Sequence, residues 1–290
     1  MAGLVFACVA PHGFPLIPEL SDDAEGALAT RAAMEVLGRR CAAARPEVLV
    51  VATPHGTRVE GAICVAGVAR AAGTLHWKGR QIEMNVPVDG PLTDLVVAQA
   101  RSKNIPIAVA SFGGNRRDQS TIPLDWGTLV PLWFLGHGRN LTAYGDVLAP
   151  APDSDPGPPV VIVAPSRALP RRAMVGFGRA IAEAAERDGR RIAFVASSDW
   201  SHTHAATGPY GYHPAAAEMD AQVVRALEEN DPARLLDLPE TSVRDAAIDG
   251  LWQTLMLAGV LEHTPMHGEL LSYEAPTYYG MLVAAYTPAT

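Results

Sequence analysis

The sequence predicts an α/β fold in which a mostly parallel or mixed central sheet carries helices on both faces. Short runs rich in β-branched residues recur along the chain and are typical of strands buried in a sheet of this kind. Segments of helical length separate most of these runs, and two of the runs end in the same tripeptide, Pro-His-Gly. We expect residues 1–290 to form a single domain; an internal division near the proline-rich stretch 146–159 is the alternative.

Turn and cap residues separate the elements expected in the first half of the chain. Strands at 4–10 and 48–53 both end at a proline, which has no N–H to donate to a sheet. The helix between them is expected to begin at Ser21, a good N-cap, and to end at Ala44 ahead of a proline. The elements expected next are an antiparallel excursion with strands at 59–66 and 81–86, a helix at 91–103 with a proline in its first turn, and a buried strand at 107–112.

The second half repeats the alternation of strands and helices. A helix is expected at 127–137, ahead of the proline-rich stretch. The elements expected after it are a strand at 160–164, a helix at 169–188, a strand at 191–196, helices at 214–229 and 244–261 with a shorter one after Pro232, and final strands at 270–273 and 280–286.

Composition narrows the class of protein. Apolar residues make up 48% and charged residues 19%, which is ordinary for a globular chain. The net charge of −8 argues against nucleic-acid and membrane partners, which favour basic surfaces. No apolar run reaches the roughly 20 residues of a membrane helix and no signal peptide is evident, so we expect a cytoplasmic protein. Three cysteines without a CxxC pair indicate neither a disulfide framework nor a thiolate zinc site.

Histidines stand at the ends of three expected strands. His12 and His55 lie in the two Pro-His-Gly tripeptides, and His202 follows the strand at 191–196. Open α/β sheets build their ligand sites at the carboxyl ends of strands. Two histidines joined by a carboxylate form a metal site typical of non-haem Fe(II) oxygenases. The alternative is that His12 and His55 are separate loop residues held by hydrogen bonds.

Four motifs also carry a resemblance that spans nearly the whole chain. In order they are the first Pro-His-Gly, Thr-Pro-His-Gly at 53–56, Leu-Asp-Trp-Gly-Thr-Leu-Val-Pro-Leu at 124–132 and Ser-Ser-Asp-Trp-Ser-His at 197–202. Together they resemble the class III extradiol ring-cleavage dioxygenases, the superfamily of the protocatechuate 4,5-dioxygenase catalytic subunit. The segment Gly-Pro-Tyr-Gly-Tyr-His-Pro at 208–214 is similar to the Memo-like branch of that superfamily.

The resemblance implies an Fe(II) cofactor held by His12, His55 and an acid from the last third of the chain. Relatives place a glutamate, or in the Memo-like branch a cysteine, before a leucine-rich helix. One alignment frame puts Ile248 at that position, and a shift by one residue gives Asp249, which we expect to be the ligand. Glu274 and Glu269 are the fallback ligands.

The same resemblance implies that the protein opens the ring of a catechol or 2-aminophenol with O2, in the catabolism of aromatic compounds. His202 matches the residue that takes a proton from the substrate and later returns one. Trp126 stands where many relatives carry a histidine, and we expect it to contact the substrate, as do Asp125, His204 and Tyr210. A small aromatic substrate and O2 are the expected partners, and the chain is expected to form a homo-oligomer.

Two other functions fit some of these features. A Memo-like binding or signalling protein would keep the pocket without ring cleavage; the segment 208–214 and Trp126 favour it, whereas an acid at position 249 does not. A zinc-dependent hydrolase is the second, because two histidines and an aspartate also suit Zn²⁺ with an activated water.

Overall fold

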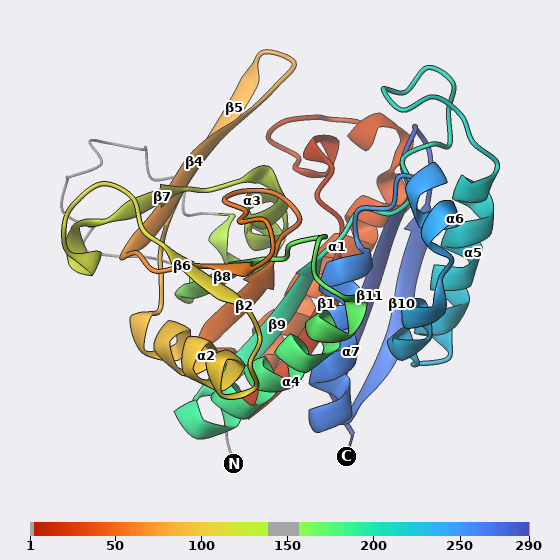
Figure 1. Cartoon of the computed structure of the whole chain (residues 1–290). Helices are drawn as coiled ribbons and strands as arrows, with labels where there is room; N and C mark the ends of the chain where they lie inside the picture. Colours follow the sequence, from red (N-terminus) through yellow and green to blue (C-terminus); the bar gives the residue numbers. More distant parts are fainter. Residues whose placement is uncertain (1–2, 139–156, 290) are drawn as a thin grey trace.

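A computed structural model describes residues 3–138 and 157–289, and its centre is an eight-stranded sheet (Figure 1). Its strands are β1 (Gly3–Ala10), β2 (Val48–Ala52), β3 (Ile63–Ala66), β6 (Ile107–Ala110), β8 (Val160–Ala164), β9 (Arg191–Ser197), β10 (Met266–Glu274) and β11 (Met281–Pro288). They lie in the order β10-β11-β1-β9-β2-β8-β3-β6. The central strands β1, β9, β2 and β8 are parallel, while β11 and β3 run antiparallel to β1 and β8. The predicted mixed sheet is therefore confirmed.

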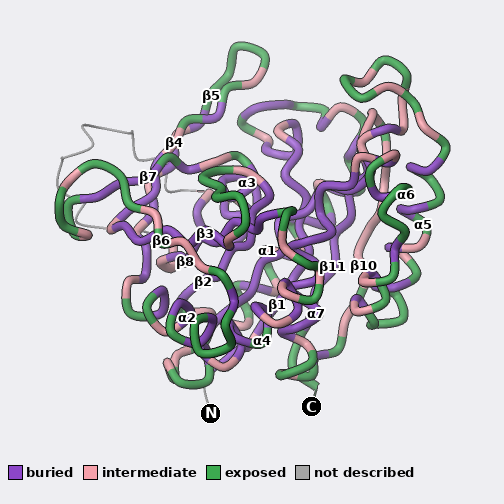
Figure 2. Tube along the Cα trace, viewed as in Figure 1, coloured by how far each residue is buried: buried purple, intermediate pink, exposed green. Residues whose placement is uncertain are grey.

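Helices cover both faces of this sheet, as predicted. One face carries α1 (Leu28–Ala44), α3 (Trp126–Leu132) and a small sheet of β4 (Arg70–Trp77), β5 (Arg80–Pro87) and β7 (Thr121–Pro123). The other carries α2 (Gly90–Ser102), α4 (Arg171–Asp188), α5 (Ala215–Glu228) and α7 (Leu251–His263). Strand β1 shows how the strands supply both cores: Phe6 and Cys8 pack on the first side, and Ala7 and Val9 on the second. Figure 2 shows the resulting buried interior.

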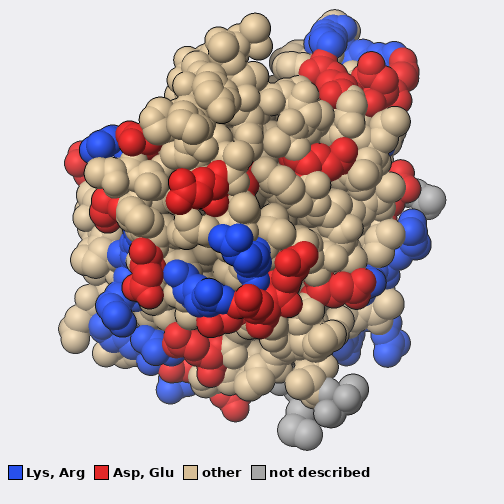
Figure 3. Space-filling view, turned by 90° about the vertical axis from the view of Figure 1, so that its right-hand side faces the viewer, with Lys and Arg blue, Asp and Glu red and all other residues tan. Residues whose placement is uncertain are grey.

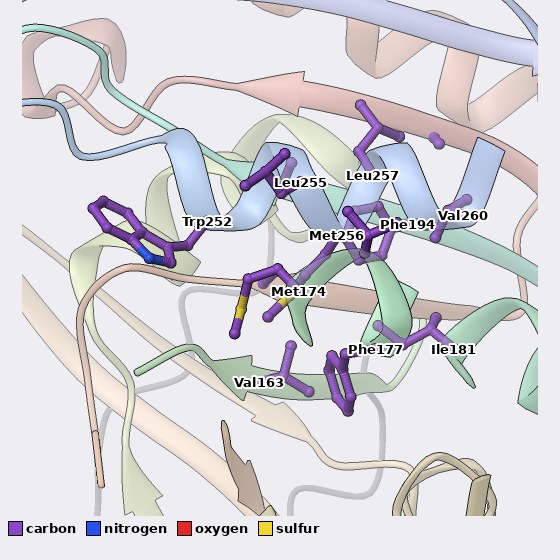
Figure 4. Packing of buried hydrophobic residues seen from close by; sticks show 14 of the residues in the cluster. Val163, Met174, Phe177, Ile181, Phe194, Trp252, Leu255, Met256, Leu257 and Val260 are labelled. Carbon is purple, nitrogen blue, oxygen red and sulfur yellow. The ribbon is translucent and has the colours of Figure 1, made fainter. Parts of the chain in front are cut away.

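The second core depends on close contact between α4 and α7 (Figure 4). A Cβ added to Gly178 of α4 would lie 1.9 Å from the carbonyl oxygen of Met256, and one added to Gly259 of α7 would lie 1.9 Å from that of Val175. Glycine at both positions lets the two backbones touch, which any larger residue would prevent.

Helix α1 begins later than predicted. Residues 24–26 form a 3₁₀ turn in which Ala24 and Glu25 have positive φ, so the chain is not helical before Leu28. The Ser21 hydroxyl donates to the Asp23 carboxylate instead of capping a helix. Acidic residues in 22–25 suggested a first helical turn, but local side-chain hydrogen bonds stabilise a turn there instead.

The predicted antiparallel excursion forms with different strands. Its hairpin is β4–β5, which projects from the molecule in Figure 1, whereas β3 joins the main sheet between β8 and β6. Strand β6 is an edge strand, and Val109 is 47% exposed, so the prediction of a buried strand there was wrong. Short apolar runs indicate strands, but they do not specify which neighbours will pair with them.

The single helix predicted at 244–261 is two helices separated by a break. Helix α6 (Glu240–Asp245) ends before Ala246, Ala247 has φ of 50°, and α7 begins at Leu251. The predicted helix at 127–137 is α3 followed by a π-helical turn, Trp133–His137, and the short helix expected after residue 232 is a 3₁₀ segment, Pro232–Asp237. Most of the stretch 146–159, where an internal division was considered, lies outside the described residues.

Two further observations concern the surface charge and the length of the helices. On the face shown in Figure 3, basic and acidic side chains lie intermingled rather than in separate patches. Within residues 3–138 and 157–289, no helix combines the length and apolar character needed to cross a bilayer.

Candidate metal centre and aromatic cavity

Two strand ends and the break before α7 bring His12, His55 and Asp249 together. The Nε2 atoms of His12 and His55 lie 3.2 Å apart. Oδ2 of Asp249 lies 3.5 Å from Nε2 of His12 and 3.7 Å from Nε2 of His55. Within the described residues these three form a group whose potential ligand atoms all lie within 4.8 Å of one another. The structure thus assembles the expected two-histidine, one-carboxylate set around a single point.

The backbone that presents each histidine follows from its tripeptide. After β2, Gly56 has φ of 75°, a left-handed conformation that favours glycine and turns the chain at once. After β1, Gly13 has an ordinary conformation, but an added Cβ would lie 2.6 Å from the hydroxyl oxygen of Tyr279. The two glycines therefore serve different purposes, a turn in one copy and close packing in the other.

Hydrogen bonds orient the His12 ring toward the shared point. Its Nδ1 lies 3.0 Å from the Ser197 hydroxyl oxygen, and that hydroxyl donates to the carbonyl of Gly127. Because the serine proton is used, the serine oxygen accepts from Nδ1–H, which leaves Nε2 to face His55 and Asp249. A metal-binding histidine is usually held this way, with its second nitrogen donating to a fixed acceptor.

The His55 ring packs against the ring of Trp126. Its ring lies 4.1 Å from that of Trp126, centroid to centroid, with planes 31° apart. Burial lowers the pKa of His55 to about 3, and the neighbouring His12 adds to this effect. The imidazole is therefore neutral near neutral pH, which is the form that binds a metal.

Asp249 has one oxygen satisfied and one free. Its Oδ1 accepts a hydrogen bond of 2.6 Å from Arg167, whose guanidinium also stacks on Trp252. Its buried Oδ2 accepts no hydrogen bond from any described group. Burial opposes ionisation, but the nearby His12 outweighs it and lowers the pKa of Asp249. A buried, ionised oxygen aimed at two imidazole nitrogens fits a cation, since such an atom otherwise carries an uncompensated desolvation cost.

Asp199 is a second acid at this centre that sequence reasoning did not assign to it. Its Oδ2 lies 3.3 Å from Nε2 of His12, and its Oδ1 accepts the backbone N–H of His12. Burial raises the pKa of Asp199, whereas for His12 the carboxylates of Asp199 and Asp249 outweigh burial and raise the pKa.

His202 lies beside the metal-ligand group and faces the same cavity. Its Nδ1 is 3.1 Å from the carbonyl oxygen of Ala247, in the break before α7. A carbonyl can only accept, so Nδ1 carries the proton and Nε2 is the nitrogen left for a ligand. The ring stacks on Tyr279 with centroids 5.5 Å apart and planes 17° apart. Two contacts thus fix its orientation.

A cavity of about 400 Å³ opens next to these residues. His12, His55, Asp199 and His202 line it, together with six aromatic side chains: Phe14, Trp77, Trp126, Tyr210, Tyr278 and Tyr279. Trp126 and Tyr210, both predicted to contact substrate, line this cavity. The other four aromatic residues were not identified from sequence; the adjacent tyrosines 278–279, in a loop before the last strand, were the only available signal.

Two residues expected at the substrate have other positions. Asp125 caps α3, accepting hydrogen bonds from Thr53 and Thr128, and it is not among the described residues that line the cavity. His204 lies 2.8 Å from Oδ2 of the buried Asp220 and is likewise absent from that lining. Each of these polar side chains is used to hold a loop or helix end, and their contact with substrate stays a prediction.

Neither fallback ligand reaches the metal centre. Glu274 accepts hydrogen bonds from the backbone N–H and hydroxyl of Thr30, so it caps the start of α1. Glu269 forms an exposed ion pair with Arg40, at 2.6 Å. Both carboxylates are explained by these contacts, so Asp249 is the one of the three predicted acids that reaches the two histidines.

The fold and the site together define a member of a known enzyme superfamily. The model of one family, the catalytic LigB subunit of aromatic ring-opening dioxygenase, matches residues 7–284. The chain belongs to this family. The match extends over both Pro-His-Gly tripeptides, the segment around His202 and the residue Asp249.

The names of two similar proteins state no activity. Protein CA_C1420 of Clostridium acetobutylicum is 25% identical over 266 residues, which is 91% of this chain and 53% of that protein. The chain thus spans about half the length of that curated relative. The crystal structure of the uncharacterized protein JW3007 from Escherichia coli K12 matches with a TM-score of 0.59 at 15% identity, covering 97% of this chain and 99% of that one, and supports the fold alone.

Proposed function

We propose that this protein is a non-haem Fe(II)-dependent extradiol dioxygenase that opens the ring of a catechol-type or 2-aminophenol-type substrate with O2. The observation that supports it best is the convergence of Nε2 of His12, Nε2 of His55 and Oδ2 of Asp249 beside an aromatic cavity that His202 also lines. Membership of the ring-opening dioxygenase family points to the same chemistry.

In this proposal His12, His55 and Asp249 hold the metal. When bound, Fe(II) at a site of two histidines and one carboxylate supplies Lewis acidity to adjacent substrate oxygens and electrons for O2. The overall reaction breaks the ring carbon–carbon bond next to the diol and places both oxygen atoms of O2 in the product. The roles of the protein residues are to bind the ring, keep water out and move protons.

His202 is the residue placed to move protons. With Nδ1–H donated to Ala247, Nε2 takes the proton of a substrate hydroxyl and returns it as the ring opens. The imidazole suits both steps because its ordinary pKa lies near neutrality. Trp126 cannot carry a proton, but it fixes His55 by stacking and offers a face to the substrate ring.

The test is an anaerobic iron titration followed by exposure to catechols, 2-aminophenol and air. We expect stoichiometric iron binding, O2 uptake and an absorbing ring-opened semialdehyde, with the iron-loaded His202→Phe variant as the inactive control. Full iron loading without O2 uptake across the substrate panel would contradict the proposal and favour a Memo-like binding role. Hydrolysis supported by Zn²⁺ but not by Fe²⁺ would favour a zinc hydrolase.

Location and assembly are further parts of the proposal. We propose that the protein acts in the cytoplasm and as a homo-oligomer. Light scattering of the purified protein measures its assembly state, and a monomer at working concentration would refute that part.

A further inference from the structure

We propose that the cavity selects catechols whose ring substituent is apolar and uncharged, and that it discriminates against those carrying a carboxylate. This inference rests on the proposed function, because it names the substrate class of the same site. Three features of the cavity support it: its aromatic lining, the ion pairs that already occupy the charged groups around it, and its volume.

The walls are aromatic on two sides. Phe14, Trp77 and Trp126 form one group, in which Phe14 lies edge-on to both tryptophans, with centroid distances of 5.4 and 6.1 Å. On the second wall the rings of Tyr278 and Tyr279 lie 4.9 Å apart. The first wall stacks on His55 through Trp126 and the second on His202 through Tyr279. A flat ring held near the metal ligands therefore extends between aromatic surfaces, which favour apolar or aromatic groups.

No lysine or arginine lines the cavity among the residues that the structure describes, and its three histidines lie at the metal end. Two cations close to the lining are already paired, and a third is exposed and outside it. Arg167 is paired with Asp249, Lys78 is paired with Glu25, and the exposed Arg58 acts on His55 from outside the lining. A carboxylate on the substrate would thus lose its hydration without gaining a partner, which is strongly unfavourable.

The acidic residues of the lining do not make a site for a cation either. Glu25 is already neutralised by its ion pair with Lys78 at the tip of the β4–β5 hairpin. Asp199 is buried against His12, where it accepts the backbone N–H and belongs to the metal end of the cavity. With both acids accounted for, the part of the cavity away from the metal ligands presents a neutral surface.

The size of the cavity leaves room for a substituent. Its volume of about 400 Å³ falls in the range of roughly 300–1,000 Å³ that accommodates drug-sized ligands, which are larger than one catechol ring. Aromatic residues line this space, so an apolar substituent gains contact there when it is buried.

The test compares three catechols with short side chains of similar length. Propylcatechol ends in a methyl group, dopamine in an ammonium group and dihydrocaffeate in a carboxylate. Binding is measured anaerobically by calorimetry, to the metal-free and to the iron-loaded protein. We expect propylcatechol to bind at least about tenfold more tightly than dihydrocaffeate in both forms, since the terminal group changes only the desolvation cost. Dihydrocaffeate binding equal to or tighter than that of propylcatechol would overturn the inference, as would tightest binding of dopamine, which would identify a cation site.

A gain-of-charge variant adds an independent check. Tyr210 lines the cavity and is 64% exposed, and Tyr212 on the same loop is 65% exposed but is absent from the described lining. Tyr210→Arg should improve dihydrocaffeate binding severalfold relative to propylcatechol, whereas Tyr212→Arg should leave the ratio unchanged. Equal effects of the two variants would overturn the assignment of selectivity to the cavity wall. If the affinity order holds but no catechol is cleaved in air, the proposed function fails while this inference stands. If catechols are cleaved but those with a carboxylate are preferred, the proposed function stands and this inference fails.

Discussion

Removing the Ser197 hydroxyl tests whether the His12 ring is oriented for a metal. Ser197 is fully buried, and its oxygen accepts from Nδ1–H of His12 while its proton goes to the Gly127 carbonyl. In Ser197→Ala the ring loses the acceptor that keeps Nε2 toward His55 and Asp249. Loss of such a partner costs about 10- to 100-fold in metal affinity, which corresponds to roughly 1.4–2.7 kcal/mol.

The assay is competition with a chelating dye for Zn²⁺, and for Fe²⁺ without air. Ser198→Ala is the matched control, because Ser198 is equally buried at the next position but its hydroxyl faces Gly250 and Thr254, each at 3.4 Å. Removing the acceptor also leaves a buried N–H unsatisfied, which costs about 1–3 kcal/mol of stability. The free energy of unfolding of the metal-free variants is therefore measured as well, so that a loss of stability is not mistaken for a loss of metal affinity. If Ser197→Ala binds both metals within about twofold of wild type, the orientation argument is refuted.

Three further predictions concern the ligands, the proton carrier and an ion-pair network. Asp249→Ala should lose stoichiometric iron while Glu269→Ala keeps it, measured as bound iron per chain; iron retained by Asp249→Ala would exclude it as a ligand. His202→Phe should keep its iron but lose about 10²- to 10⁴-fold in ring-opening rate, and an unchanged rate would remove its role as acid and base. The Arg190 guanidinium hydrogen-bonds Asp188 and holds the pKa of that carboxyl below 3.8. A carboxyl group whose pKa is lowered by folding stabilises the folded protein at pH values above the ordinary pKa of that group, and this stabilisation is lost as the pH falls. Arg190→Leu should therefore reduce the free energy of unfolding by about 1–2 kcal/mol near neutral pH and by progressively less below about pH 4, measured by urea unfolding. A cost independent of pH would contradict this account.

Sequence patterns predicted the layered fold and the convergence of His12 and His55. Both depend on local features, namely apolar runs that end at Pro-His-Gly, and on the rule that parallel strands end at one edge of a sheet. The break before α7 was not predicted, because the apolar residues after Ala246 continue a helical pattern and only φ of Ala247 reveals the interruption.

The supporting residues were harder to predict because their roles arise from tertiary contacts. Ser197 and Asp199 belong to the same motif as His202, but both contact His12. Ser197 is 185 residues away from His12 in the sequence and Asp199 is 187 residues away. Arg167 follows an ordinary strand end, and nothing local pairs it with Asp249. Asp125 and His204 looked available for substrate, but polar side chains at loop ends are often used by the fold itself.

The two glycines between α4 and α7 have a consequence for the metal centre. Asp249 lies on the short segment directly ahead of α7. The distance between α7 and α4 therefore also determines the position of the Asp249 carboxylate. Replacing Gly259 by alanine would push the helices apart, although the site of the change lies a full helix away from the imidazoles. If the proposed metal binds there, a chain altered at Gly259 is expected to remain folded and yet hold that metal less tightly, so that metal content would report on how tightly the two helices fit.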